Sequence, residues 1–312
     1  MASVLLGLLG AATLTAGDTL LERDFCQSYY PTELESQGYP PCAAVRSQVM
    51  ANLSRPLPTL ELGPATAPGM IFVHGWPDSG AEFAPQFAHF CYSGRFRCVA
   101  VTWQNFHPDL PDAPSADLEF EITMARLAAT IEQAGLRDTT LVIHDWGSFI
   151  GYQFMHLYPT LMNRVVSFDI GSGGHPNITY QAQNNIAWAK HDSSISEGSA
   201  EYWCAPCPSC AVWRTTWPYV SALSFRGLHP CGAGPCPGPP TDKPLLFLWG
   251  NTTCGKPRTA TSKFFDQAWL DFVKTTPHGH VVETPGDHWM HVVSLSFTFC
   301  AFCWGILTGC LR

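Results

Sequence analysis

Short, mostly apolar runs recur along the chain and alternate with helical patterns. The runs are MIFV (70–73), FRCVAV (96–101), TLVI (140–143), VVSF (165–168), LLFL (245–248) and HVVE (280–283). Such runs, separated by helices, are typical of strands that are buried on both faces of a parallel sheet. The pattern therefore predicts an α/β fold, with a mostly parallel sheet and helices on both of its faces.

One helix can be placed with its boundaries between the second and third of these runs. In LEFEITMARLAATIEQAG (118–135) the apolar side chains recur every three or four residues, at Phe120, Met124, Leu127 and Ile131. This spacing gives an amphipathic helix with one buried stripe. Gly135 is the residue type expected just beyond the helix end.

The pattern changes in the second half of the chain. Residues 175–242 hold no clear strand and include HPCGAGPCPGPP (229–240), which has too much Pro and Gly for regular structure. We interpret 1–25 as a leader, 26–174 as the first part of the α/β core and 175–242 as an inserted cap. Residues 243–312 would be the second part of the core, with an apolar C-terminal tail.

Composition excludes one class of partner. Of 312 residues, 46% are hydrophobic and 13% charged, and the net charge is −8 without a basic cluster. A large core is possible, but no electrostatic footprint for DNA, RNA or an anionic membrane surface is present.

Three features favour the secretory pathway or a membrane-associated location over the cytoplasm. The chain has 13 cysteines, and Cys26/Cys42 and Cys91/Cys98 are spaced so that each pair could close a loop, although sequence does not fix connectivity. Glycosylation triplets begin at Asn52, Asn177 and Asn251. The opening MASVLLGLLGAATLTAG has the apolar centre of a signal peptide but lacks its basic start.

The C-terminal tail leaves its own alternatives open. Residues 292–311 form a run of twenty uncharged residues, which is long enough to span a bilayer. A buried terminal helix or an incorrect gene model at this end explains the run equally well, because it is rich in Ser, Thr, Gly and Cys.

Candidate chemistry follows four of the predicted strands. The segments are HGWPD (74–78), HDWGS (144–148), FDIGSG (168–173) and GDHWMH (286–291). Because ligands of open parallel sheets bind at the carboxyl ends of the strands, we expect these segments to line one site.

These motifs resemble those of the α/β-hydrolase superfamily, and within it the epoxide hydrolases and haloalkane dehalogenases, over roughly residues 57–290. HGWP is similar to the oxyanion loop, HDWG to a nucleophile elbow with aspartate as the nucleophile, and DHW to the catalytic-histidine motif. The resemblance implies an α/β-hydrolase fold with an inserted cap.

The resemblance assigns Asp145 as the nucleophile. A carboxylate that attacks a saturated carbon opens an epoxide or displaces a halide and leaves an alkyl ester on the enzyme. Ile143 stands where the family has a small residue, whereas Gly147 supplies the small residue on the other side. The alternative is a cap on the following helix.

His288 is implied as the base that activates water, with His291 as a fallback. Such a base needs an orienting acid. Thr253 occupies the family's usual position for this acid, so we expect Asp169, in the family's alternative position, to serve, with Asp266 as a substitute. Asp169 could otherwise cap the loop that enters the cap domain.

The remaining roles also come from the resemblance. The backbone N–H groups of Trp76 and Trp146 are the expected oxyanion donors, and the Trp146 indole could hold a leaving halide. The expected substrate contacts are Tyr180, Tyr219, His74 and Pro77. The two tyrosines would protonate an epoxide oxygen, with Tyr202 as a third candidate and ordinary packing as the alternative.

Five cysteines of the cap have partly zinc-like spacing: Cys204, Cys207, Cys210, Cys231 and Cys236. Disulfides explain them in a secreted protein and a structural zinc explains them in the cytosol.

The sequence thus predicts a hydrolase that forms an ester on Asp145, acts on a small apolar epoxide or alkyl halide, and needs water but no cofactor or catalytic metal. Epoxide ranks first and halide second. An inactive binding protein of the same fold and a cofactor-free oxygenase are the alternatives.

Overall fold

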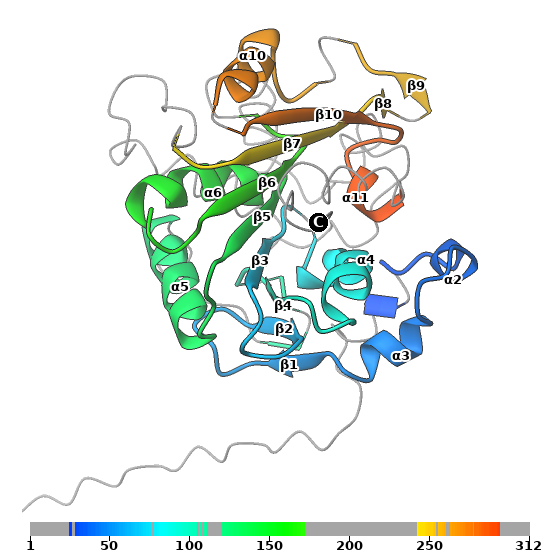
Figure 1. Cartoon of the computed structure of the whole chain (residues 1–312), viewed down its shortest axis with the longest axis vertical. Helices are drawn as coiled ribbons and strands as arrows, with labels where there is room; N and C mark the ends of the chain where they lie inside the picture. Colours follow the sequence, from blue (N-terminus) through cyan, green and yellow to red (C-terminus); the bar gives the residue numbers. More distant parts are fainter. Residues whose placement is uncertain are drawn as a thin grey trace, which may run out of the picture.

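One eight-stranded sheet forms the centre of the molecule (Figure 1). The computed structural model describes residues 25–26, 29–76, 78–104, 106–107, 109–110, 120–171, 242–253, 255–259, 263–276 and 278–293. The strands are β1 (Met50–Asn52), β2 (Thr59–Leu62), β3 (Gly69–Val73), β4 (Arg97–Val101), β5 (Thr140–His144), β6 (Arg164–Phe168), β7 (Leu245–Gly250) and β10 (His280–Thr284). A separate two-stranded sheet joins β8 (Thr252–Thr253) to β9 (Lys256–Pro257).

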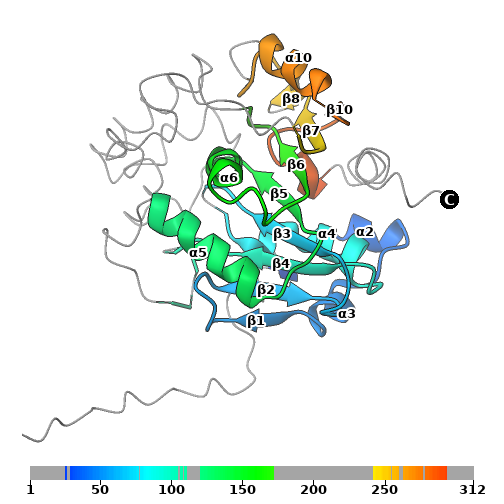
Figure 2. The ribbon, with the colours of Figure 1, turned by 60° about the vertical axis from the view of Figure 1, so that its left-hand side comes forward.

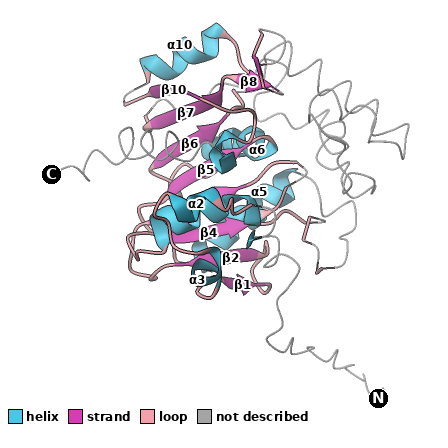
Figure 3. Cartoon of the chain, turned by 90° about the vertical axis from the view of Figure 1, so that its right-hand side faces the viewer, coloured by secondary structure: helices cyan, strands magenta, loops and turns pink. Residues whose placement is uncertain are grey.

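The strand order is β1-β2-β4-β3-β5-β6-β7-β10. From β4 to β10 all neighbours are parallel, whereas β1 and β2 form an antiparallel edge. Figure 3 shows β5, β6, β7 and β10 following one another across the sheet. All six strands expected from apolar runs are confirmed within two residues at each end. The expected runs did not include β1 and β2.

Both faces of the sheet are covered, as predicted, because alternate strand residues enter two separate cores. Phe72, Val142 and Val166 face one core together with Phe83 and Phe87. Ile71, Leu141 and Val165 face the other, which is filled by α5 (Phe120–Gln133), α6 (Trp146–Leu157) and α10 (Gln267–Thr275). Figure 2 shows α5 and α6 on one side of the strands. The predicted amphipathic helix is α5, which buries Phe120, Met124, Leu127 and Ile131.

Short helices cover the first core. They are α2 (Glu33–Ser36), α3 (Cys42–Arg46), a 3-10 turn η1 (Gly80–Phe83), α4 (Ala84–Gln86), a π-helical turn η2 (Phe87–Cys91) and α11 (Met290–Val293). On this side Phe25, Phe83, Phe87 and Phe90 are fully buried.

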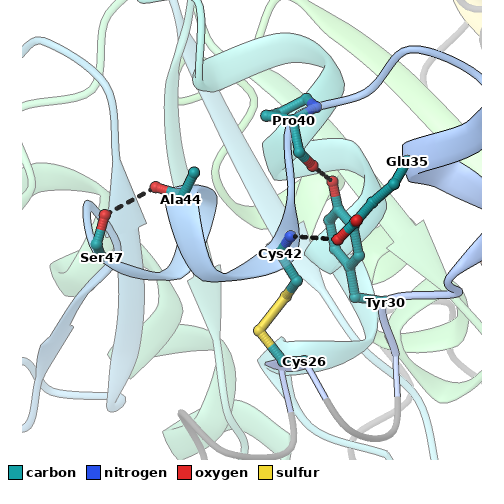
Figure 4. Close-up of a disulfide and its surroundings, with 7 residues drawn as sticks. All are labelled: Cys26, Tyr30, Glu35, Pro40, Cys42, Ala44 and Ser47. Atoms are coloured by element: carbon teal, nitrogen blue, oxygen red, sulfur yellow. Dashed lines mark hydrogen bonds between the residues drawn. A yellow bond between two sulfur atoms is a disulfide. The ribbon is translucent and has the colours of Figure 1, made fainter.

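Two disulfides tie this layer together. One links Cys26 to Cys42 at the start of α3, and Figure 4 shows Tyr30 beside it, donating a hydrogen bond of 2.5 Å to the Pro40 carbonyl. The other links Cys91 to Cys98 of β4. Both of the pairs that sequence spacing singled out are therefore bonded. In the chain-entropy account, closing the 16-residue separation of the first pair stabilises the fold by about 3 kcal/mol.

Residues 175–241 of the proposed cap, 1–24 of the proposed leader and 294–312 of the tail lie outside the described residues. The strands that flank this interval are direct neighbours, with Val165 of β6 paired to Leu245 of β7. Within the described ranges no helix has the length and apolar character needed to cross a membrane.

Candidate active site

The carboxyl ends of four parallel strands meet at one place. Trp76 follows β3, Asp145 follows β5, Asp169 follows β6, and His288 lies in the loop after β10. Although these residues are far apart in the sequence, the structure brings Asp145, Asp169 and His288 into direct contact. The expectation that the motifs after the strands line one site is met for these four residues.

Asp145 sits on a sharp turn between β5 and α6. Its φ of 50° and ψ of −122° lie in a region that L-residues rarely adopt, so the turn holds the side chain out of the sheet. The turn depends on close packing, because a Cβ on Gly147 would overlap the backbone of Val73 and His74. Ile143, unusual at its position, packs beside a second small residue, Gly151.

The contacts of Asp145 argue against a role as a helix cap. It occupies the cap position of α6, yet its side chain accepts no hydrogen bond from that helix. Instead, Oδ1 accepts the Trp76 backbone N–H at 2.7 Å, and Oδ2 lies 3.2 Å from His288 Nε2. Gly75 permits this approach, because a Cβ there would overlap the Asp145 side chain. Both carboxylate oxygens thus face groups outside the helix.

His288 is held from its other side by Asp169. The distance from His288 Nδ1 to Asp169 Oδ2 is 2.6 Å. The Asp169 side chain is fully buried, whereas that of Asp145 is 14% exposed, so only Asp145 is placed to meet a substrate. Asp169 also has a positive φ of 65°, which turns its carboxylate away from the end of β6.

Arg258 adds a second positive charge beside Asp145, Asp169 and His288. The sequence analysis did not identify it. Its Nη1 donates to Asp169 Oδ1, and both side chains are almost completely buried. Its Nε donates to Thr253 Oγ1 at 3.1 Å, so the threonine that replaces the family's usual acid also contacts this arginine. No motif marks Arg258, which lies 89 residues from Asp169.

Attraction between opposite charges keeps Asp145, Asp169 and His288 ionised although they are largely buried. Burial lowers the pKa of His288, but hydrogen bonds and negative charge from Asp145 and Asp169 outweigh it and raise the pKa to about 9. Burial raises the pKa of both aspartates. His288 outweighs this for Asp145, as Arg258 and His288 do for Asp169, and both carboxyl pKa values stay below the ordinary range. The arrangement is an imidazolium between two carboxylates.

The two residues considered as alternatives for the orienting acid and the base lie away from Asp145. Asp266, considered as a substitute acid, caps α10 instead by accepting the Trp269 backbone N–H at 2.8 Å. His291, considered as a fallback base, is fully buried and stacks on Phe168, on the side of the sheet that α4 covers.

His74 was expected to contact substrate, but in the structure its side chain contacts protein groups instead. The residue is fully buried; its Nε2 accepts the Trp103 backbone N–H at 2.9 Å and its Nδ1 lies 2.6 Å from the Gly75 carbonyl oxygen. Burial lowers its pKa to about 3. With both ring nitrogens occupied, His74 fixes the loop after β3 and leaves no group for a ligand.

The other expected residues are only partly placed. The Trp146 indole packs against Phe120 and Phe149 and is half-buried. Pro77, Tyr180, Tyr202, Tyr219 and the five cap cysteines lie outside the described residues. Asp78, directly after HGWP, was not singled out, yet its carboxylate accepts hydrogen bonds of 2.9 Å from Tyr29 Oη and Trp289 Nε1.

Comparison with known proteins gives partial matches in sequence. A model described as alpha/beta hydrolase fold matches residues 68–193. Epoxide hydrolase 2 of Caenorhabditis elegans is 27% identical over 127 residues, which are 40% of this chain and 34% of that protein. Epoxide hydrolase 3 of Mus musculus is 30% identical over 106 residues, 33% of this chain and 28% of that protein. The chain therefore spans about a third of the length of these relatives.

Solved structures match over a larger share of the chain. A Vigna radiata epoxide hydrolase mutant has a TM-score of 0.64 at 15% identity and covers 84% of this chain and 99% of its own. A Bacillus megaterium epoxide hydrolase in complex with an inhibitor has a TM-score of 0.54 at 18% identity, covering 83% and 97%. The expected α/β-hydrolase fold is confirmed.

Replacing Arg258 tests how much the buried ion pair contributes to folding. Arg258→Met leaves the buried Asp169 carboxylate without its partner and should lower the free energy of unfolding by about 3–5 kcal/mol, measured by urea denaturation. The matched control is Arg164→Met, which breaks the exposed pair with Asp138 at 2.8 Å. That change should cost less than about 1 kcal/mol. Equal losses in the two variants would contradict the assigned role of Arg258.

The pKa of His288 tests the electrostatic description. In Asp145→Asn one of the two neighbouring negative charges is gone, so the pKa should fall from about 9 toward the ordinary value near 6.5. NMR titration of the imidazole resonances measures it. Asp266→Asn is the control, because Asp266 caps α10 and should leave the His288 titration unchanged. An unchanged pKa in Asp145→Asn would show that Asp145 does not set the charge of His288.

Proposed function

We propose that this chain, which has the α/β-hydrolase fold and is similar in sequence to epoxide hydrolases, hydrolyses epoxides through a covalent ester on Asp145. One observation carries the proposal. The Asp145 carboxylate is bound on one oxygen by the Trp76 N–H and faces His288 with the other, and Asp169 holds the far side of the histidine. This is the arrangement of a nucleophile, a donor, a base and an orienting acid.

In the first step Asp145 Oδ2 attacks one epoxide carbon. A new C–O bond forms, the ring C–O bond breaks, and its electron pair goes to the ring oxygen as an alkoxide. The alkoxide takes a proton from an acid above it, a role that we assign to Tyr180 and Tyr219. The Trp76 N–H keeps Oδ1 as the carbonyl oxygen of the ester and so selects Oδ2 for attack.

Forming the ester also changes the role of His288. While Asp145 is ionised, its charge helps to hold His288 in the imidazolium form. Esterification removes that charge, so the pKa of His288 falls. Its proton then passes through solvent to the tyrosine that was deprotonated in the first step, and the neutral ring can act as a base. Asp169 remains charged and keeps the imidazole in the orientation that presents Nε2 to water.

In the second step His288 Nε2 takes a proton from water, and the hydroxide oxygen bonds to the ester carbonyl carbon. The negative charge on Oδ1 is stabilised by the N–H groups of Trp76 and Trp146. Collapse breaks the bond between the carbonyl carbon and Oδ2, and the leaving alkoxide takes the proton of the new Asp145 carboxyl group. This releases the diol, leaves an oxygen from water in the Asp145 carboxylate and leaves His288 as the imidazolium.

An alkyl halide is the second candidate substrate, because the same attack would displace a halide. The observation in its favour is Trp146, which directly follows the nucleophile in the sequence and carries an indole N–H that could hold a halide. The epoxide hydrolases among the relatives favour the epoxide. Turnover of a panel of epoxides and haloalkanes separates the two, while binding without turnover would indicate an inactive protein and oxygen uptake would indicate an oxygenase.

The covalent route can be tested by labelling with heavy-oxygen water and by replacing His288. After a single turnover in H₂¹⁸O the peptide that holds Asp145 should carry the label. In His288→Gln the ester should accumulate, and intact-protein mass spectrometry should detect an increase equal to the mass of the epoxide. His156→Gln, at an exposed position on α6, is the control and should turn over normally. Active protein with an unlabelled Asp145 peptide would exclude the ester.

We further propose that the protein folds in the secretory pathway. The bonded pairs Cys26–Cys42 and Cys91–Cys98 support this, because disulfides persist in oxidising compartments. Peptide mapping of the protein from its native cells, without reduction, should recover both linked pairs, together with glycan on Asn52. Free thiols at all four cysteines and an unmodified Asn52 would contradict the proposal.

A further inference from the structure

A second group of titratable side chains lies behind the proposed catalytic residues and is not used by them. It consists of Glu82 of η1, His144 at the end of β5 and His291 of α11, and all three are fully buried. One ligand atom from each lies within 4.8 Å of the others. The three come from separate elements, and tertiary packing brings them to one point beneath the Asp145 turn.

The hydrogen bonds of His144 fix which ring nitrogen carries a proton. Its Nε2 lies 3.0 Å from the His288 carbonyl oxygen, which can only accept, so Nε2 is protonated. In the neutral ring Nδ1 then presents a lone pair, and it faces both Glu82 carboxyl oxygens at 3.3 Å. A lone pair and a carboxylate repel each other, so a positively charged species, either a proton or a metal ion, belongs between them.

His291 favours the metal ion over the proton. Neither of its ring nitrogens has a hydrogen-bond partner among the described residues, although its Nε2 lies 3.9 Å from Glu82 Oε1. A proton shared by Glu82 and His144 would leave this buried ring unsatisfied, at a cost in free energy. A single ion bound by all three side chains would pair the Glu82 carboxylate, the His144 Nδ1 lone pair and one of the two His291 ring nitrogens.

We propose that Glu82, His144 and His291 bind a divalent transition-metal ion of the zinc class, in a buried site that stabilises the fold and takes no part in the reaction. Two imidazoles and a carboxylate are a common donor set for zinc. Ligand atoms at about 2.0–2.1 Å from zinc and at the tetrahedral angle lie about 3.3–3.4 Å apart, which matches the separation of His144 and Glu82. The separation of His291 Nε2 from Glu82 Oε1, 3.9 Å, is about 0.5 Å longer than this, so the His291 ring must move toward the ion to complete the set.

The charges around the cluster agree with a bound cation. Burial raises the pKa of Glu82, and the neighbouring Asp78 and Asp145 carboxyl groups raise it further. A cation would relieve that crowding. Both rings are fully buried, and imidazole binds metals in its neutral form. Through the His288 carbonyl, the ion would also fix the loop that carries the proposed base.

The experiment uses the full chain, purified without a histidine tag, incubated with zinc sulfate and desalted. Metal analysis should find zinc in the wild type. The zinc content of Glu82→Gln and of His291→Gln should each be lower by about one ion per chain. His156→Gln, which removes an exposed imidazole on α6, should retain the full amount. Circular dichroism establishes that each variant is folded.

X-ray absorption at the zinc edge of the wild type makes the test independent of how the variants fold. Nitrogen and oxygen neighbours at about 2.0–2.1 Å support the proposal. Zinc with only sulfur neighbours at about 2.3 Å would indicate the cap cysteines and overturn it. Absence of zinc after loading would also overturn it and would favour the shared proton. Neither result depends on the ester at Asp145, so the metal site and the proposed reaction are tested independently.

Discussion

The structure around the site depends on balancing buried negative charge. Asp145 and Asp169 both lie within hydrogen-bond distance of one imidazole, and Asp169 is completely buried. Without compensating positive charge, two carboxylates so close together would raise each other's pKa, and one of them would take up a proton. His288 and Arg258 supply the two positive charges that keep both ionised. Because the charges are matched inside the protein, Asp145 remains a carboxylate that can act as a nucleophile.

Backbone geometry determines where the two carboxylates point. Asp145 and Asp169 each end a parallel strand in a positive-φ conformation, and neighbouring strands end at the same edge of the sheet. The two carboxylates therefore point to the same space, where the loop after β10 brings His288. Packing of α6 on β3 through Gly147 holds the strained turn. The conformational strain at Asp145 is therefore offset by packing of the surrounding core.

Acidic side chains continue behind the first group of charges. Glu82 and Asp78 lie on the side of the sheet covered by η1, and His144 connects them to the site through the His288 carbonyl. Asp78 is held by Tyr29 and Trp289. The interior beneath the nucleophile turn thus holds more carboxyl groups than the proposed reaction uses, and the placement of His291 among them is the feature that the metal site explains.

The sequence by itself determined the sheet and the positions of the main reactive groups. The apolar runs predicted the buried strands, and residues after such runs reach the carboxyl edge of a parallel sheet, so the four segments that follow them could be placed at one site. The choice of Asp145, Asp169 and His288 within those segments came from the resemblance to epoxide hydrolases and haloalkane dehalogenases. Only the tertiary structure decided which other groups join them. Arg258 meets Asp169 across 89 positions and Glu82 meets His144 across 62. No local pattern encodes such contacts, because they depend on how separate loops pack. The same packing gave His74 a structural role, since burial and two hydrogen bonds occupied a side chain that its motif had suggested for substrate.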